Sequence, residues 1–360
     1  MHWRNLFFVD YHQLHNPSVL LKIAWFVSSL GHEWVVVFFV LSGYLVGGSV
    51  LRSRSQGTWN WPDYLRARFT RLYIVLIPAL VLGALFDFAG IHQSGSQALY
   101  AGQSGIETLQ ANVHQTLTFP ALTGNLLYLQ DLKGWGRFFH IPTFGSNGPL
   151  WSLSIEFWCY LAFPPLVIAC AKSQRWPIRI LCASIFCAIA TLVGLPCAAL
   201  CVAWLFGVLI TRLPRYRPRQ PWLRYLAIIA ALCLFLGALI LGKAISLPSS
   251  VIELFLALAV TVFIWTLLHC TAAPGLKLFV QISQHSARSA YTLYLVHLPV
   301  LVFLKAWLHL PQAYPEWRAL PLPLVILLAV LLYAQAVYFC FEKQTGRLRN
   351  WLRTGRVSYP

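Results

Sequence analysis

Long apolar stretches alternate with short polar connections along almost the whole chain. Nine of them approach or reach the length of about 20 residues that a helix needs to cross a bilayer. They lie at about residues 34–51, 69–88, 148–170, 178–193, 196–211, 223–241, 250–268, 290–308 and 322–341. Helices are expected because an open sheet leaves backbone groups unsatisfied in lipid, and the alternating pattern of a barrel does not occur. The pattern therefore predicts an all-α fold, a polytopic transmembrane helix bundle.

The composition agrees with a chain that has the lipid bilayer as its solvent. Of the residues, 58% are hydrophobic and only 10% are charged, whereas roughly a quarter of a soluble domain is charged. This difference excludes an ordinary soluble enzyme. The nine cysteines lie in apolar runs or at their ends and form no CxxC pair. We therefore expect them to be packing residues and not a disulfide framework.

The cations are divided unequally between the two sides of the predicted bundle. The chain carries 27 Lys and Arg against 10 Asp and Glu, and 20 of the cations fall on one side. They lie in the connections at 52–71, 172–179, 212–224 and 277–288 and in the tail at 343–356. Because basic connections stay in the cytoplasm, we expect a multi-pass plasma membrane protein with a cytoplasmic C-terminus. Nucleic acid is not expected as a partner, since the basic residues form no single patch.

The chain is expected to form a single membrane domain at residues 1–345, followed by a basic cytoplasmic tail at 346–360. The longest connection, 89–147, lies on the outer side, and a loop of this length is expected to be structured or re-entrant. Gly194, Leu195 and Pro196 between two short stretches predict a tight hairpin.

Ionisable residues inside predicted spans are candidates for function because they are expensive to bury in lipid. Glu156 lies about eight residues, or ~12 Å of helix, from the outer end of its stretch near Gly148. It is either a functional carboxyl or a protonated one that bonds a neighbouring helix. His297 lies about seven residues, or ~10 Å, from the expected cytoplasmic end of its stretch. It is either a packing histidine or a functional one, whose neighbour Pro299 frees backbone groups that could bind it.

Two further histidines lie on the expected outer side. His32 and Glu33 stand at the mouth of the first stretch. They are either an interfacial polar pair or a proton acceptor with its orienting carboxylate, as general-base catalysis requires. His2 is the other candidate, although a histidine so near the N-terminus ordinarily belongs to a disordered tail.

Three arginines open the second stretch, at Arg66, Arg68 and Arg71. The positive-inside bias alone explains such a group, but three guanidiniums also suit an anion such as a nucleotide phosphate. In the preceding stretch, Gly43 and Gly47 have the small-xxx-small spacing of close helix packing. No Walker loop, HExxH, GxSxG or dinucleotide fingerprint is present, and no metal is expected.

Four segments resemble the acyltransferase family 3 membrane proteins, in that family's order and spacing: FFVLSGYLVG, RARFTRLYIVLIPAL, GPLWSLSIEFWCYLAFPPL and YTLYLVHLPV. The resemblance implies transfer of an acyl group, often acetyl, from cytoplasmic acyl-coenzyme A to a hydroxyl of an envelope glycan or a small-molecule acceptor. It implies a bacterial inner membrane location. On this basis the expected catalytic residues are His2, Glu156, His32 and His297, and the expected coenzyme-binding residues are Arg66, Arg68 and Arg71.

Family members commonly have ten spans, the first with an Arg and, ten residues on, a His. That span and its Arg are not found here. His2 has the relative position of the family's histidine, so the resemblance implies that a helix upstream of Met1 is missing and that His2 matches the catalytic residue. The alternative class is a secondary transporter or flippase for an envelope lipid or sugar, which would also bury ionisable residues. An inverted repeat would favour a carrier, and none is visible in the sequence.

Overall fold

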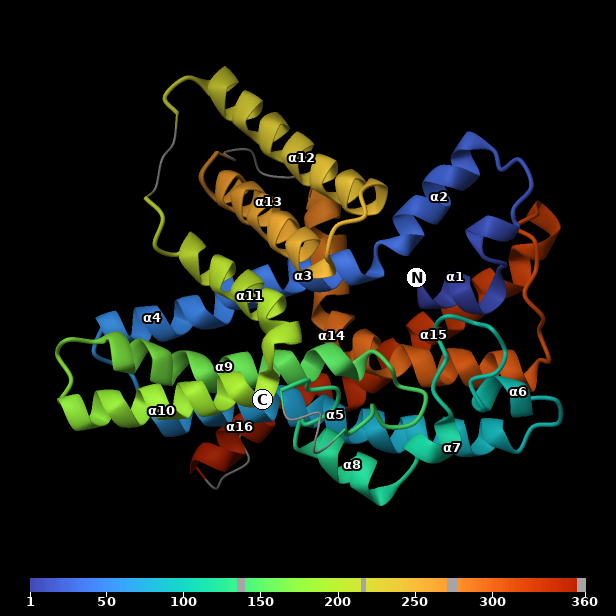
Figure 1. The fold of residues 1–360 in the computed structure, drawn as a ribbon, viewed down its shortest axis with the longest axis horizontal. Coiled ribbons are helices and arrows are strands. Elements are labelled where there is room, and N and C mark those ends of the chain that lie inside the picture. The colour runs from blue at the N-terminus through green and yellow to red at the C-terminus, as the bar shows by residue number, and fades with distance from the viewer. Residues whose placement is uncertain (135–139, 215–217, 271–276, 355–360) are drawn as a thin grey trace.

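The computed structural model describes residues 1–134, 140–214, 218–270 and 277–354, and this part of the chain contains helices but no strands. Most of the long helices lie side by side as one bundle, from which the pair α12 and α13 projects on one side (Figure 1). The predicted all-α, multi-pass bundle is confirmed.

Eight segments of the described chain are long and apolar enough to cross a membrane, and each coincides with a predicted stretch. The remaining stretch, predicted at 196–211, is the shorter helix α11 with its preceding 3₁₀ turn. The spanning helices are α3 (Gly31–Ser42) continued by η2 (Gly43–Gly47) and α4 (Gly48–Ser55), α5 (Trp61–Ile91), α9 (Leu150–Cys170), α10 (Trp176–Val193), α12 (Pro221–Ala244), α13 (Ser249–Cys270), α14 (Lys277–Trp307) and α15 (Pro321–Cys340); α11 is Ala198–Ile210.

The outer connection is a folded structure, as predicted. It contains three short helices, α6 (Gln97–Tyr100), α7 (Val113–Thr116) and α8 (Phe119–Leu126). Tyr100 and Tyr128 in this connection are fully buried. The hairpin between α10 and α11 is also confirmed: Gly194 has a φ of 84°, which an L side chain rarely adopts, and η3 (Leu195–Cys197) follows it.

The N-terminal segment is folded against the outer end of the bundle. It forms α1 (His2–Phe7), a 3₁₀ turn η1 (Tyr11–Gln13) and α2 (Val19–Ser29). Leu6 and Phe7 are almost fully buried in a hydrophobic cluster with the outer half of α14. The backbone of Phe7 and Val9 also bonds that of Ala313. His2 therefore belongs to a fixed helix and not to a disordered tail.

Small residues let the helix containing the Gly43 motif approach α11 closely, as predicted. A Cβ on Gly43 would lie 1.8 Å from the backbone oxygen of Trp204, and one on Gly207 would lie 1.9 Å from that of Val40. The contact continues through η2, a π-helical segment, and such segments are frequent at functional sites. This crossing places Trp204 against Ser42 inside the bundle.

Prolines inside two helices free backbone carbonyls that other helices then bind. Pro164 leaves the carbonyl of Tyr160 free, and the hydroxyl of Tyr64 donates to it at 2.9 Å. Pro299 leaves the carbonyl of Leu295 free, and the side-chain amide of Asn147 donates to it at 2.8 Å. Both bonds tie α9 or its entry loop to a neighbouring helix.

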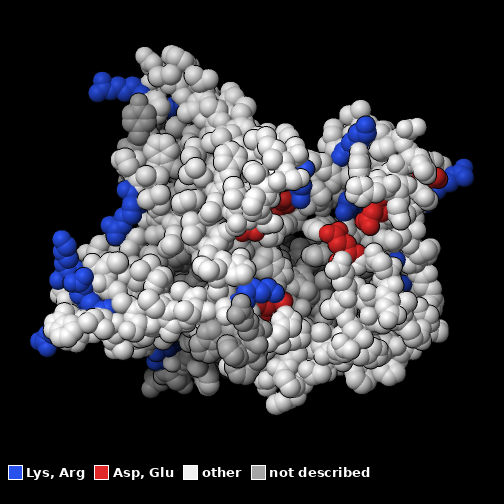
Figure 2. Space-filling model, viewed as in Figure 1, with Lys and Arg blue, Asp and Glu red and all other residues white. Residues whose placement is uncertain are grey.

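The chain beyond α15 turns back onto the bundle. The 3₁₀ turn η5 (Glu342–Gln344) leads into α16 (Thr345–Thr354), which packs against α5. In Figure 2 Lys and Arg lie over α4, the α9–α10 connection and the start of α12, and others lie around a hollow near the middle and on the side of α2. Most of the visible carboxylates lie around this hollow. The cations of α4, the α9–α10 connection and the start of α12 belong to the connections that the sequence predicts on the cytoplasmic side.

Candidate active site

Polar side chains repeat at helical spacing on the facing sides of α9 and α14. Residues three or four apart lie on one face of a helix. The two helices meet where the hydroxyls of Ser152 and Tyr294 bond at 2.7 Å, and Tyr294 also donates to the carbonyl of Pro149 at 2.7 Å. We call this series the polar column; its members are Ser152, Glu156 and Tyr160 of α9 and Tyr291, Tyr294 and His297 of α14.

A pair of histidines closes the outer end of the polar column. The rings of His2 and His297 lie 5.3 Å apart, centre to centre, with their planes inclined at 39°. Nδ1 of His297 donates to the carbonyls of Leu293 and Tyr294 at 3.0 and 2.9 Å. Its Nε2 therefore carries the lone pair and can accept a proton.

His2 is half-buried, and its Nδ1 atom is buried without a hydrogen-bond partner. Burial, together with the smaller effect of the neighbouring His297, lowers the pKa of His2 to about 3. The imidazole is therefore neutral at pH 7, and its lone pair is available to a proton donor.

The predicted depth of His297 was counted from the start of its apolar stretch, and the helix that contains this stretch begins earlier. α14 begins at Lys277, so His297 is about 30 Å of helix from that end and about 15 Å from Trp307 at the outer end. The prediction took the apolar run for the whole helix, whereas α14 continues inward through polar residues. The carbonyl freed by Pro299 binds Asn147 and not His297.

The second outer histidine, His32, has a carboxylate partner from another helix. Its Nε2 lies 2.8 Å from Oε1 of Glu253, and its ring stacks on Trp151 with the ring centres 5.8 Å apart. Glu33, its neighbour in sequence, bonds Lys243 at 2.8 Å. The structure thus gives His32 a different orienting carboxylate from the one that the sequence suggested.

The two histidine pairs lie near each other at the outer end. A Cβ on Gly31, next to His32, would lie 2.7 Å from the sulfur of Met1, next to His2. On the other side, the first turn of α9 carries Trp151 under His32 and Ser152 on the polar column. His2, His32 and His297 therefore lie at the same end of the bundle as the start of α9.

Glu156 is almost fully buried in the middle of the polar column. Its Oε1 accepts hydrogen bonds from the hydroxyls of Tyr160 and, at 2.9 Å, of Ser42 on α3. Ser42 in turn accepts from the indole of Trp204 at 3.2 Å. These hydroxyl donors compensate for the loss of water. Within the described residues Glu156 bonds neighbouring hydroxyls and not a histidine, so it does not orient one directly.

The three arginines at the inner end do not form one group. Arg66 and Arg68 are about 200° apart around α5 and point to different sides. Arg66 bonds Asp63 at 2.7 Å, and Arg71 forms an ion pair with buried Glu342. Arg71 also lies over the ring of Tyr291 at 5.1 Å. The predicted cluster of three free guanidiniums is therefore divided.

Arg68 is the arginine that lies beside the polar column with spare donors. Its guanidinium lies 5.9 Å from the ring centre of Tyr64 and 5.8 Å from that of Tyr160. Its Nε is buried and has no hydrogen-bond partner. Because an unpaired buried donor is costly, this group is suited to bind an anion that enters from the inner side.

Several residues that bond the candidate side chains were not indicated by the sequence analysis. Tyr160 has the helical spacing of four from Glu156, which could have indicated it. Glu342 binds Arg71 and also accepts from the backbone and hydroxyl of Thr292. Glu342 could have been indicated by the sequence, because it is a carboxylate among basic residues at the expected cytoplasmic end of the last span. No local pattern indicates Glu253, because its partner is 221 positions away.

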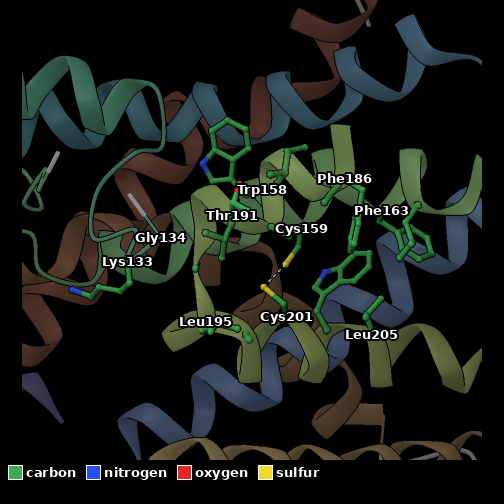
Figure 3. A pocket seen from close by; sticks show the side chains of 18 of the residues that line it. Lys133, Gly134, Trp158, Cys159, Phe163, Phe186, Thr191, Leu195, Cys201 and Leu205 are labelled. Carbon is green, nitrogen blue, oxygen red and sulfur yellow. Dashed lines mark hydrogen bonds between the residues drawn. The ribbon is translucent and has the colours of Figure 1, made fainter. Parts of the chain in front are cut away.

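A cavity of about 840 Å³ lies elsewhere, between α9, α10 and α11 (Figure 3). Its lining is mostly apolar, with Lys133 at one end and the thiols of Cys159 and Cys201 3.7 Å apart within it. It meets the site through Trp204, whose ring lines the cavity and whose indole nitrogen bonds Ser42. The histidines and arginines of the site do not line it. All nine cysteines are free, as predicted.

Comparisons with known proteins identify the family. The acyltransferase 3 family, described as an acyltransferase domain, matches residues 2–340. A protein of Shigella phage Sf6, described as an O-acetyl transferase, is 27% identical over 134 residues, which are 37% of this chain and 34% of the phage protein. The match thus spans about a third of that relative's length. No solved structure matches. Because the family match covers nearly the whole chain, the chain belongs to the acyltransferase 3 family, and its long apolar helices are those of a multi-pass membrane protein.

Proposed function

We propose that the protein moves an acyl group, most simply acetyl, from acyl-coenzyme A at the inner end to a hydroxyl at the outer end. The acceptor is a carbohydrate of the envelope or another hydroxyl-bearing small molecule. The observation that carries this proposal is the polar column, which connects Arg68 to the pair His2 and His297 through an apolar bundle.

The inner end supports an anionic donor. Coenzyme A carries its charge on phosphates at the end opposite its thiol, so the phosphates remain at the membrane surface while the thioester enters the bundle. Arg68, with an unpaired buried Nε beside Tyr160, is the first group of the column that an entering phosphate meets. Charge-assisted bonds to phosphate are among the strongest that a guanidinium forms.

The middle of the column supplies hydrogen-bonding groups to the amide-containing arm of the coenzyme. Tyr160, Glu156 and Ser42 bond one another there, and Ser152 and Tyr294 continue the series outward. Polar groups inside a membrane bundle are tolerated where they bond each other or line a passage. The column therefore suits an elongated polar ligand better than an apolar one.

The outer end supports proton transfer. In the proposed reaction, neutral His2 accepts the proton of the acceptor hydroxyl while the hydroxyl oxygen attacks the thioester carbonyl carbon. The carbon–sulfur bond then breaks, the thiolate takes the proton from His2, and the ester and free coenzyme leave. His297 holds its lone pair at Nε2 beside His2.

The chain is proposed to lie in the plasma membrane, the inner membrane of a bacterium, with the basic loops and C-terminus in the cytoplasm. The asymmetric distribution of Lys and Arg supports this orientation. It places Arg68 on the side where acyl-coenzyme A is made.

The test is transfer of radiolabelled acetyl from acetyl-coenzyme A by membranes that contain the protein. We expect wild-type membranes to label a hydroxyl acceptor and His2→Ala membranes not to. His92→Ala is the matched control, because Nδ1 of His92 also bonds a helix carbonyl but the residue is exposed at the end of α5. Equal labelling with His2→Ala and wild type would contradict the proposed mechanism.

A further inference from the structure

A small basic cavity lies between α5 and α16, on the opposite side of α5 from Arg68. Its volume is about 200 Å³. The cavity brings together two segments that are far apart in the sequence, the arginine motif at the start of α5 and the last helix of the described chain. Its lining consists of Asp63, Arg66, Ala67, Arg349, Asn350 and Arg353.

The charges around this cavity are unbalanced. Three of the lining residues are arginines and one is an aspartate, which bonds Arg66 at 2.7 Å. Arg349 and Arg353 are four residues apart on one face of α16, where like charges destabilise a helix. A bound anion would offset this repulsion. Guanidiniums match the planar, two-oxygen geometry of a phosphoryl group especially well.

The size and position of the cavity restrict the anion. Pockets that hold a whole small molecule usually measure about 300–1,000 Å³, so 200 Å³ suits a phosphoryl group and not an entire nucleotide. Arg66 faces the cavity, while Arg68, about 200° away on α5, faces the polar column. A ligand with two separated anionic groups can therefore bind Arg66 with one group and Arg68 with the other, on the two sides of α5.

We propose that Arg66, Arg349 and Arg353 bind the 3′-phosphate on the ribose of coenzyme A. The inference rests on the proposed function, in which acyl-coenzyme A is the donor. In this arrangement the diphosphate of the coenzyme, which adjoins its pantetheine arm, lies nearer Arg68. The ribose 3′-phosphate lies beyond the diphosphate and reaches the small basic cavity between α5 and α16. The family match ends at residue 340, so α16 lies beyond it. The last helix thus becomes part of the donor site.

The experiment compares two donors, acetyl-coenzyme A and acetyl-3′-dephospho-coenzyme A, with wild type and with the double variant Arg349→Ala/Arg353→Ala. We expect the variant to raise the KM for acetyl-coenzyme A about tenfold or more without changing kcat, since two charge-assisted bonds are lost. The dephosphorylated donor should raise the KM of wild type by a similar factor, and the variant should add nothing further.

Arg347→Ala is the matched control. Arg347 is exposed on the same helix and bonds Gln344 within its own segment at 3.1 Å, outside the cavity. We expect its KM values to equal those of wild type. Arg349→Lys/Arg353→Lys keeps the charge of the helix but not the forked geometry, and we expect an intermediate KM.

Three outcomes would overturn the inference: an unchanged KM for acetyl-coenzyme A in the double alanine variant, an equal rise for both donors, or a rise confined to vesicles with anionic phosphatidylglycerol. The last would mean that the cavity binds a lipid phosphate, so the assay is run both in neutral detergent micelles and in such vesicles. Failure of the proposed function gives a different result, because wild type would then transfer acetyl from neither donor.

Discussion

The two ends of the polar column are built from different chemistry. The inner end contains arginines, two of which already bond carboxylates, Arg66 to Asp63 and Arg71 to Glu342. The outer end contains a half-buried pair of histidines, of which His2 keeps its lone pair at neutral pH. The inner groups are permanently charged and suited to binding, whereas the outer groups are neutral and can exchange a proton. The proposed function uses this difference, with binding of the donor at one end and reaction at the other.

This division corrects the simplest interpretation of the candidate residues as one active site. Glu156 lies between the two ends of the polar column. It bonds hydroxyls of the column and its neighbours and is not the partner of a histidine. His32 belongs to a second outer pair, with Glu253, which ties α3 to α13. Variants in these regions should therefore affect different kinetic constants.

After the loss of labelling expected for His2→Ala, the next largest effect is that of His297→Gln, beside the proposed base at the outer end. Loss of a group that takes part in proton transfer typically costs 10²–10⁴-fold, and we expect kcat to fall by about 100-fold or more with little change in the KM for the donor. Steady-state acetyl transfer measures both constants. A tenfold rise in KM with unchanged kcat would mean that the outer end binds instead of reacting.

At the inner end, Arg68→Ala should have the complementary effect. We expect the KM for acetyl-coenzyme A to rise about ten- to a hundredfold, as loss of a charge-assisted bond predicts, while kcat falls much less. Lys22→Ala, an exchange of a cation on α2 at the outer side, is the control. An unchanged KM with Arg68→Ala would remove the basis for donor binding at this end.

The effect of Glu156→Gln in the middle should be smaller. The amide oxygen can still accept from Ser42 and Tyr160, so we expect the melting temperature to stay within a few degrees and kcat to fall by about tenfold. Glu156→Ala leaves those hydroxyls without an acceptor and should cost about 1–3 kcal/mol of stability. Thermal unfolding together with acetyl transfer separates the two effects. A full loss of activity with Glu156→Gln at unchanged stability would give Glu156 a direct part in the reaction.

The pH dependence should be nearly flat. The pKa of His2 is lowered to about 3 by burial, so its protonated, inactive form is populated only near and below that pH. An ordinary histidine would lose half of its base form at about pH 6.5. We expect kcat/KM to vary little between about pH 8 and pH 5. A decline with its midpoint near 6.5 would show that the working base is a solvated histidine.

Much of the fold could be predicted from the sequence, because each membrane-spanning helix is recognised from its own residues alone. Eight predicted stretches coincide with spanning helices, and the Gly43 motif packs closely as its spacing indicated. A span needs only its own length and apolarity to be recognised. The shorter α11 shows where this rule becomes uncertain, because its length is set by the neighbours that it packs against.

The grouping of the candidate residues could not be read from the sequence. The start of α14 could not be predicted from its apolar stretch, because the helix extends inward beyond that stretch. The partners of His32 and Arg71 come from helices more than 200 positions away. Adjacent residues such as His32 and Glu33 point to different helices, so local pairing was a poor guide to contacts. The missing helix upstream of Met1 stays a prediction.

The most direct test of the proposed role of the polar column is to measure from which side of the membrane the acetyl donor must be supplied. Sealed membrane vesicles of both orientations, prepared from cells that contain the protein and its acceptor, are supplied with radiolabelled acetyl-coenzyme A, which does not cross the bilayer. The account predicts that acetyl is incorporated into the acceptor only when the donor reaches the face with the basic loops, and that the product appears on the opposite face. Incorporation when the donor reaches only the other face would contradict it.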